Sequence, residues 1–256
     1  MKTIFFFILM IYWSLIILAP VLANNKNINQ PNKIIFLVYT MRMFKNFFLI
    51  LIISLSFLTS ALAEKVIVFE FTEEEKKILK VRKVKKETTY TLGSNENGNF
   101  LKAEAEGKAS GLGIKKKINL LKTPFINITW KVEKDLFGID EQSKKGHDYA
   151  ARVFVIKKTG TTPLSNRAIN YVYSSNNEVD KYWRSPFTKK SIDYVLANTK
   201  SNLNEWVTVK ANVKDHFKKL HMIDVNEIEG VAIMTDTDNS KKLAIAYYQN
   251  IYFSSE

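Results

Sequence analysis

From Lys65 to its end, the chain is a succession of short segments that have the composition and alternation of β-strands. In Phe100–Glu106, for example, Leu101, Ala103 and Ala105 alternate with charged residues, as in a strand with one buried face. The segment Lys214–His221 is the best helix candidate, and Thr72–Lys80 is a second, poorer one. A chain with this pattern has to bury its strands by packing one sheet on another.

The pattern therefore predicts an all-β fold, an antiparallel β-sandwich of the jelly-roll kind with at most one or two short helices. No strand–helix–strand repeat is present, which disfavours a doubly wound nucleotide-binding fold. Residues 64–256 are long enough for a single β-sandwich domain with a sizeable core. The predicted strands are Lys65–Phe71, Lys83–Leu92, Phe100–Glu106, Leu112–Leu121, Phe125–Val132, Tyr149–Lys157, Arg167–Ser174, Ile192–Ala197, Trp206–Val213, Ile228–Thr235 and Leu243–Phe253.

The first 63 residues contain two segments that resemble export signals. Residues 1–23 carry an apolar run behind Lys2, and residues 41–63 carry a basic start, an apolar run and the small-x-small site Ala61-Leu62-Ala63. Because a cleaved signal has no use behind another one, we favour a true start at Met41 or Met43, with residues 1–40 as translated upstream sequence. In two alternatives, residues 4–19 stay as a membrane anchor, or both segments insert as a hairpin. Each interpretation predicts that residues 64–256 work outside the cytoplasm, in the periplasm or the extracellular space.

Charge and composition limit the classes of function. Residues 1–63 hold five of the 38 basic residues and none of the 25 acidic ones, so residues 64–256 have a net charge of +8. A solvated basic face accounts for this charge, and export disfavours nucleic acid as a partner. The chain has no Cys, which excludes disulfides, thiolate metal sites and a thiol nucleophile. It also has no nucleotide-binding glycine motif, no GxSxG elbow and no metal-ligand pattern among its three His.

Arg152 lies in the middle of the strand predicted over Tyr149–Lys157, among apolar residues on both faces. A guanidinium in such surroundings needs a carboxylate or carbonyl partner, because an unpaired buried charge is costly. It is either a structural ion pair or a ligand-binding residue on a sheet face. We predict that Arg152 is buried and pairs with Asp236 or Asp238, since the strand before them is the other strong strand that becomes acidic at its end.

The segment Val231–Ser240 joins this apolar strand to a run of oxygen-bearing side chains that includes Asp236, Asp238 and Asn239. Closely spaced carboxylates repel each other unless a positive group compensates. Three interpretations remain open: a structural calcium bound by these three residues, a network of Asp with Arg152, and a plain solvated turn.

The third candidate feature is aromatic. Tyr173 lies on a predicted strand, and Tyr182 and Trp183 lie in the segment that follows. Exposed rings beside polar groups bind the flat apolar faces of sugars, while rings in a core only pack. We therefore predict ligand-binding roles for Tyr173, Tyr182, Trp183 and Arg152, with core packing as the alternative.

Three long segments resemble one family: KGHDYAARVFVI (145–156), NRAINYVYSS (166–175) and VAIMTDTDNS (231–240). Together with Ala109–Leu112 and Trp130–Val132, they are similar to the bacterial exported proteins catalogued as domain of unknown function 3047, over roughly Phe69 to Phe253. His147 and Ser240 depart from the pattern, where an acid and a Thr followed by Gly are expected. The resemblance implies an exported single domain similar to carbohydrate-binding β-sandwiches, and it brings no catalytic residues.

We expect an exported, non-catalytic module that binds a glycan or another component of the envelope, with no cofactor apart from a possible structural calcium. One alternative is a glycan hydrolase or lyase on the same scaffold, for which Asp148, Asp236 and Asp238 are the candidate carboxylates. Another is a scaffold for other envelope proteins. Membrane attachment would come through the N-terminal segment.

Overall fold

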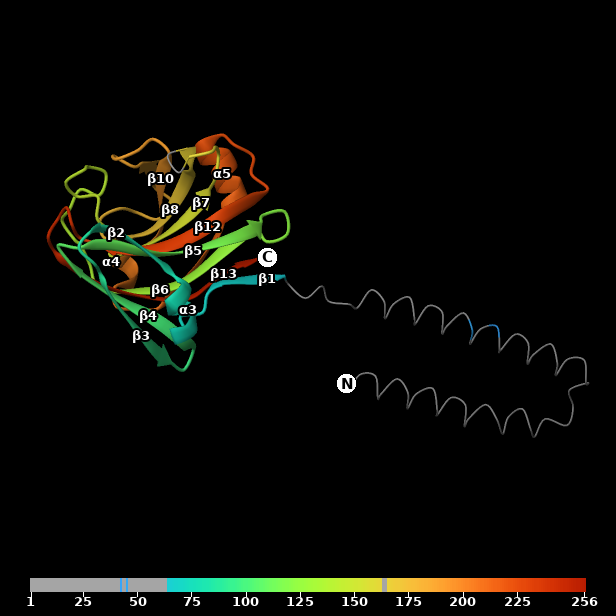
Figure 1. The fold of residues 1–256 in the computed structure, drawn as a ribbon, viewed down its shortest axis with the longest axis horizontal. Coiled ribbons are helices and arrows are strands. Elements are labelled where there is room, and N and C mark those ends of the chain that lie inside the picture. The colour runs from blue at the N-terminus through green and yellow to red at the C-terminus, as the bar shows by residue number, and fades with distance from the viewer. Residues whose placement is uncertain (1–41, 43–44, 46–63, 163–164) are drawn as a thin grey trace, which may run out of the picture. The chain divides into compact units, whose positions relative to one another are not determined.

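The computed structural model describes residues 42, 45, 64–162 and 165–256 (Figure 1). The two predicted export segments lie outside the described residues, apart from Arg42 and Lys45. Among the residues that are described, no helix is both long and apolar enough to cross a membrane.

The described chain from residue 64 onward contains thirteen strands and three short helices. The strands are β1 (Lys65–Phe69), β2 (Lys80–Lys85), β3 (Thr89–Asn95), β4 (Gly98–Glu106), β5 (Ala109–Asn119), β6 (Phe125–Lys134), β7 (Ala151–Lys157), β8 (Arg167–Ser174), β9 (Tyr182–Arg184), β10 (Ser191–Asn198), β11 (Val207–Asn212), β12 (Glu227–Asp236) and β13 (Leu243–Ser254). The helices are α3 (Glu73–Ile78), α4 (Thr199–Asn202) and α5 (Val213–His221).

The strands form two sheets that pack face to face (Figure 1). The six-stranded sheet has the order β11-β6-β13-β4-β3, with β1 paired to the last part of β13. The seven-stranded sheet has the order β2-β5-β12-β7-β8-β10-β9. All pairs are antiparallel except β8 with β10, which run parallel. The predicted all-β sandwich is confirmed, with three short helices where one or two were expected.

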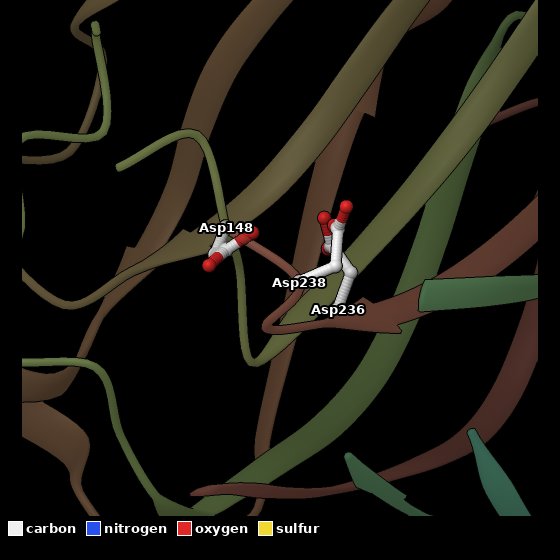
Figure 2. A group of neighbouring side chains, drawn as sticks. All are labelled: Asp148, Asp236 and Asp238. Carbon is white, nitrogen blue, oxygen red and sulfur yellow. The ribbon is translucent and has the colours of Figure 1, made fainter. Parts of the chain in front are cut away.

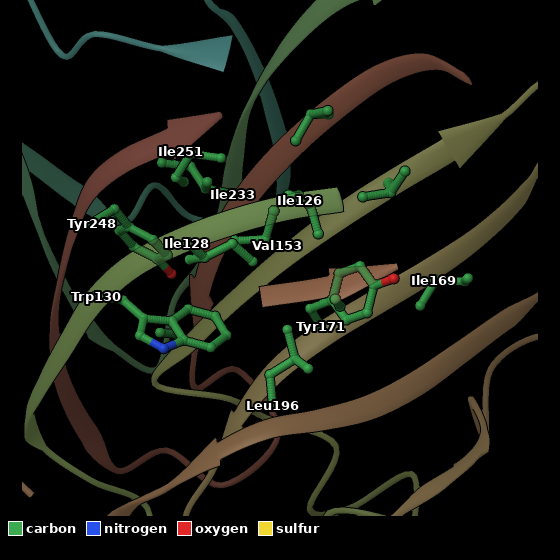
Figure 3. Packing of buried hydrophobic residues seen from close by; sticks show 14 of the residues in the cluster. Ile126, Ile128, Trp130, Val153, Ile169, Tyr171, Leu196, Ile233, Tyr248 and Ile251 are labelled. Carbon is green, nitrogen blue, oxygen red and sulfur yellow. The ribbon is translucent and has the colours of Figure 1, made fainter. Parts of the chain in front are cut away.

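The core lies between the two sheets and takes one face of each. Trp130 and Tyr248 of the six-stranded sheet meet Val153, Tyr171 and Ile233 of the seven-stranded sheet (Figure 3). The alternation predicted for β4 is confirmed, because its apolar residues are buried and its charged residues are not. Phe217 and Leu220 of α5 join the same core, which explains why this nine-residue helix forms despite its length.

One predicted strand, Lys83–Leu92, is wrong as a single element. The chain ends β2 at Lys85, reverses at Lys86, whose φ is +53°, and starts β3 in the other sheet. Thr88 lies buried at this crossover, where its hydroxyl donates to the Thr235 carbonyl and its N–H donates to Ser110. These partners are distant in sequence, so strand composition could not reveal the break.

Candidate functional site

The outer face of the seven-stranded sheet, turned away from the core, holds the candidate site. Residues paired in register across neighbouring strands point to the same face. Val153, Tyr171 and Ile233 point into the core, so their chain neighbours point outward. One residue from each of the seven strands then forms a single row across the outer face, which we call the cross-strand row: Lys80, Gly113, Ala232, Phe154, Asn170, Asp193 and Trp183.

The cross-strand row combines apolar and polar groups. Phe154, Ala232 and Trp183 are half-buried, whereas Asn170 and Asp193 are buried. Phe154 and Trp183 are separated by three interstrand spacings, or about 14 Å. Between these two rings, the Asn170 amide donates to Asp193 at 2.7 Å. The face therefore offers two rings with a buried polar pair between them.

The four residues predicted to bind ligand do not share one surface. Arg152 lies on the outer face, paired with Met234 and Val172 in the row next to the cross-strand row. Trp183 lies in the cross-strand row and packs against Tyr149, Val172 and Val195. Tyr182 and Trp183 are consecutive in β9, so their side chains point to opposite faces.

For Tyr173 the predicted ligand contact is wrong. This side chain is fully buried between the sheets, where its ring lies 5.4 Å from that of Trp130. Its hydroxyl donates to the Asn202 carbonyl at 2.8 Å. The alternative of core packing holds, because β8 is an interior strand and its inward face has to be apolar.

Tyr182 belongs to a separate aromatic stack beside α5. Its ring stacks on Tyr194 at 6.1 Å, and the Tyr194 ring stacks on His216 at 4.3 Å. Burial lowers the pKa of His216, with the nearby Lys219 acting in the same direction. Tyr182 is 49% exposed, yet it is directed away from the cross-strand row.

The predicted ion pair of Arg152 is confirmed. Its Nη2 donates to the Asp236 carboxylate, and the two residues are only 5% and 1% exposed. The guanidinium carbon also lies 5.1 Å from the ring centre of Phe154 and 5.2 Å from that of Tyr149. Arg152 is thus held between an acid and two rings, a setting in which its positive charge is compensated.

Asp236 is one of three clustered carboxylates, and Figure 2 shows it beside Asp238 and Asp148. Single oxygens of the three side chains lie within 4.8 Å of one another. Burial raises the pKa of Asp236; Arg152 opposes the rise, while Asp148 and Asp238 add to it. Of the three sequence interpretations, the Asp network with Arg152 is the one that the contacts support.

Asp148 fixes the loop that follows β12. Its carboxylate accepts from the backbone N–H groups of Asn239 and Ser240, and from the Asn239 side-chain amide at 2.8 Å. Asn239 donates to Asp148 through its amide nitrogen, and a role for its amide oxygen as a calcium ligand stays a prediction. Oxygen donors from Asp148, Asp236 and Asp238 suit a hard cation, and a calcium ion there stays a prediction.

The same contacts bear on the candidate catalytic carboxylates. Asp148 and Asp236 are 0% and 1% exposed and are bonded to the loop and to Arg152. A hydrolytic pair has to face substrate from two sides of a cleft. These two carboxylates instead hold neighbouring segments of the chain together.

Sequence reasoning missed a second buried polar group on the outer face. His147 Nε2 and Asp193 Oδ2 are 2.8 Å apart, and Asn170 donates to the other oxygen of the same carboxylate. The His147 ring packs edge-on against Tyr149 and Phe187. A single Asp within the apolar strand Ile192–Ala197 was the available signal, because it requires a buried partner.

Several buried polar atoms on this face have no hydrogen-bond partner within the described part of the chain. Six such side-chain atoms are found there in all, and three of them are Arg152 Nε, Asn170 Oδ1 and Trp183 Nε1. An unsatisfied buried group costs about 1–3 kcal/mol. Three of the six atoms therefore lie on the outer face of the seven-stranded sheet, next to the half-buried rings of Phe154 and Trp183.

The outer face of the six-stranded sheet carries a different aromatic cluster. Phe100, Trp206 and Tyr247 have ring centres 5.6–6.0 Å apart, and the Lys131 ammonium lies 4.3 Å from the Tyr247 ring centre. No atom of these three rings is among the buried unpartnered groups of the described residues. This cluster is therefore a suitable control surface for the candidate site.

Two open pockets lie away from the cross-strand row. One of about 250 Å³ is bordered by Lys65, Ile67 and Tyr252, and one of about 320 Å³ by Lys134, Phe137 and Lys242. Neither contains a residue singled out by the sequence or any of the unpartnered atoms. The candidate site on the sheet face is distinct from both pockets.

A model of the family described as "Protein of unknown function (DUF3047)" matches residues 75–252. No curated protein sequence matches the chain. The chain is similar in structure to the family 30 carbohydrate-binding module of the cellulosomal cellulase Cel9D-Cel44B of Clostridium thermocellum, with 9% identity, coverage of 75% of this chain and 98% of that chain, and a TM-score of 0.45.

Two further similar structures are enzymes. One is a variant of the Cel12A cellulase of Rhodothermus marinus, with 10% identity, 69% and 90% coverage and a TM-score of 0.43. The other is the xyloglucanase domain of NopAA from Sinorhizobium fredii in complex with cellobiose, with 9% identity, 68% and 92% coverage and a TM-score of 0.39. At these identities and TM-scores, the likeness assigns no ligand and no residue role to this chain.

Proposed function

The chain belongs to the family described as "Protein of unknown function (DUF3047)", and we propose that it is an exported, non-catalytic protein that binds a glycan on the outer face of its seven-stranded sheet. One observation supports this most: Arg152 Nε, Asn170 Oδ1 and Trp183 Nε1 have no hydrogen-bond partner among the described residues, and they lie on the same face as the half-buried rings of Phe154 and Trp183.

Sugars match this combination of groups. A hydroxyl can donate to Asn170 Oδ1 and accept from Arg152 Nε or Trp183 Nε1, so a single class of ligand can satisfy all three atoms. Because the three atoms are buried, the side chains around them have to move when the ligand binds. The apolar faces of sugar rings pack on aromatic side chains. A row that crosses seven strands spans about 29 Å, and it is suited to an extended chain more than to a small compact ligand.

The positions of the polar groups favour binding over catalysis. Two of the carboxylates near the face, Asp193 and Asp236, are buried and are bonded to His147 and Arg152, respectively. Groups held in this way shape a surface and keep rings in place. Export to the periplasm or the extracellular space, where glycans of the envelope occur, remains part of this proposal.

Trp183→Ala and Phe154→Ala are each expected to weaken glycan binding about tenfold or more, the effect of removing a central aromatic contact. The measurement is retention of the purified protein on a panel of neutral and acidic polysaccharides, followed by titration calorimetry with those that retain it. Trp206→Ala is the matched control, because it removes a half-buried indole from the opposite sheet face.

Circular dichroism and urea midpoints establish that each variant is folded before binding is compared. Absence of retention on every polysaccharide would argue against the proposal. So would a loss of binding in Trp206→Ala together with full binding in Trp183→Ala and Phe154→Ala.

A further inference from the structure

Strand β2 forms the edge of the seven-stranded sheet and is rich in positive charge. All six of its residues, Lys80–Lys85, are exposed. Lys80 and Arg82 pair in register with Gly113 and Gly111, which places both cations at the rim of the outer face. Within the described residues, neither cation has an acidic partner or a side-chain hydrogen bond, so both charges face solvent.

A strip without large side chains lies between these cations and the rest of the face. Gly111 and Gly113 contribute nothing beyond the backbone, and Ala232 and Gly230 follow on β12. A Cβ at Gly111 would lie 2.9 Å from the Ile233 carbonyl oxygen, so the close approach of β5 and β12 requires glycine there. Arg82, Gly111, Met234 and Arg152 pair in one register row, so only the backbone of Gly111 lies between Arg82 and Met234.

A second observation points to a ligand at the far side of this strip. Arg152 is about 95% buried, and its Nε has no partner among the described residues. Its Nη2 also lies 3.6 Å from the Met234 sulfur, which is a weak acceptor. An anionic oxygen is a stronger partner for a guanidinium than a thioether or a neutral hydroxyl.

We infer that the glycan bound on this face is acidic, and that Lys80 and Arg82 bind its carboxylate or sulfate groups along the glycine strip. This inference rests on the proposed function and specifies its ligand class. Of the carboxylates near the face, Asp236 is paired with Arg152, and Asp193 is bonded to His147 and Asn170. Asp148 accepts hydrogen bonds from the loop after β12. Asp238 is the remaining member of the carboxylate cluster beside Arg152, and its charge opposes an anionic group there.

The test uses pairs of polymers that differ only in charge: polygalacturonate against its fully methyl-esterified form, and dextran sulfate against dextran. The protein is expected to bind at least one charged member about tenfold more tightly than its neutral counterpart, and salt should weaken that binding. The two pairs also distinguish carboxylate from sulfate as the preferred group.

The double variant Lys80→Gln/Arg82→Gln should lose most of this preference while it keeps residual binding to the neutral member. Lys122→Gln/Lys210→Gln is the matched control, because it removes the same charge from exposed positions outside the rim. If both double variants lose the preference for the charged polymer equally, the attraction is non-specific and the inference is overturned.

The two proposals fail in different ways. Binding that is equally tight to charged and neutral members contradicts the acidic ligand and leaves the glycan-binding function standing. Absence of binding to all four polymers and to the wider panel contradicts both.

Discussion

Replacing Arg152 with Met is expected to lower the free energy of unfolding by about 3–5 kcal/mol, because it leaves the Asp236 carboxylate buried without its partner. Asp236 is 1% exposed, and its neighbours Asp148 and Asp238 are also acidic. Urea unfolding of the purified protein measures the loss.

Two variants show whether the missing charge pair is the cause. Arg82→Met removes an exposed guanidinium from the same sheet and should change stability by no more than about 0.5 kcal/mol. Arg152→Met/Asp236→Leu removes both charges and should recover much of the stability, since an apolar pair of similar size often replaces a buried ion pair. A loss in Arg152→Met as small as that in Arg82→Met would contradict the structural role.

The second large effect is expected in the core: Trp130→Ala should cost about 3–5 kcal/mol, as is usual when a large buried aromatic side chain is deleted. Trp130 is 0% exposed in β6 and lies between Val207 of β11 and Tyr248 of β13 in register. Its ring packs on Tyr173 of the opposite sheet, so its loss opens a cavity between the sheets.

The matched control for this core variant is Trp206→Ala, on the outer face of the same sheet. Trp206 is half-buried and packs on Phe100 and Tyr247 without reaching the core. Its removal should cost clearly less, because solvent fills the space that it leaves. Equal losses of stability for the two tryptophans, measured as urea midpoints at equal slope, would contradict the assignment of inner and outer faces.

Much of the fold could be predicted because the alternation of buried and exposed side chains along a strand is visible in a short stretch of sequence. Alternation in Phe100–Glu106 identified the buried face of β4, and apolar residues on both faces of Tyr149–Lys157 identified β7 as a central strand. The ion pair of Arg152 followed from the same reasoning, since a charge in a central strand needs a nearby acid and the end of β12 provides one.

The features of the fold and of the candidate site that could not be predicted depend on pairing between distant segments, which a local sequence pattern does not encode. Whether Tyr182 or Trp183 faces the site depends on how β9 pairs with β10. A tyrosine suits both the inner and the outer face of a sheet, so the residue type alone does not place Tyr173. Its side chain lies in the core because β8 is an interior strand between β7 and β10. The contact of His147 with Asp193 joins residues 46 positions apart and needs the folded loop before β7.

NMR shift mapping tests whether the outer face of the seven-stranded sheet is the glycan-binding surface. Backbone amide and indole signals are followed while a glycan retained in the polysaccharide panel is titrated into the protein. We expect the largest shifts at Phe154, Asn170 and Trp183 and at their neighbours in the cross-strand row. Shifts centred on Phe100, Trp206 and Tyr247, with the row unaffected, would contradict it.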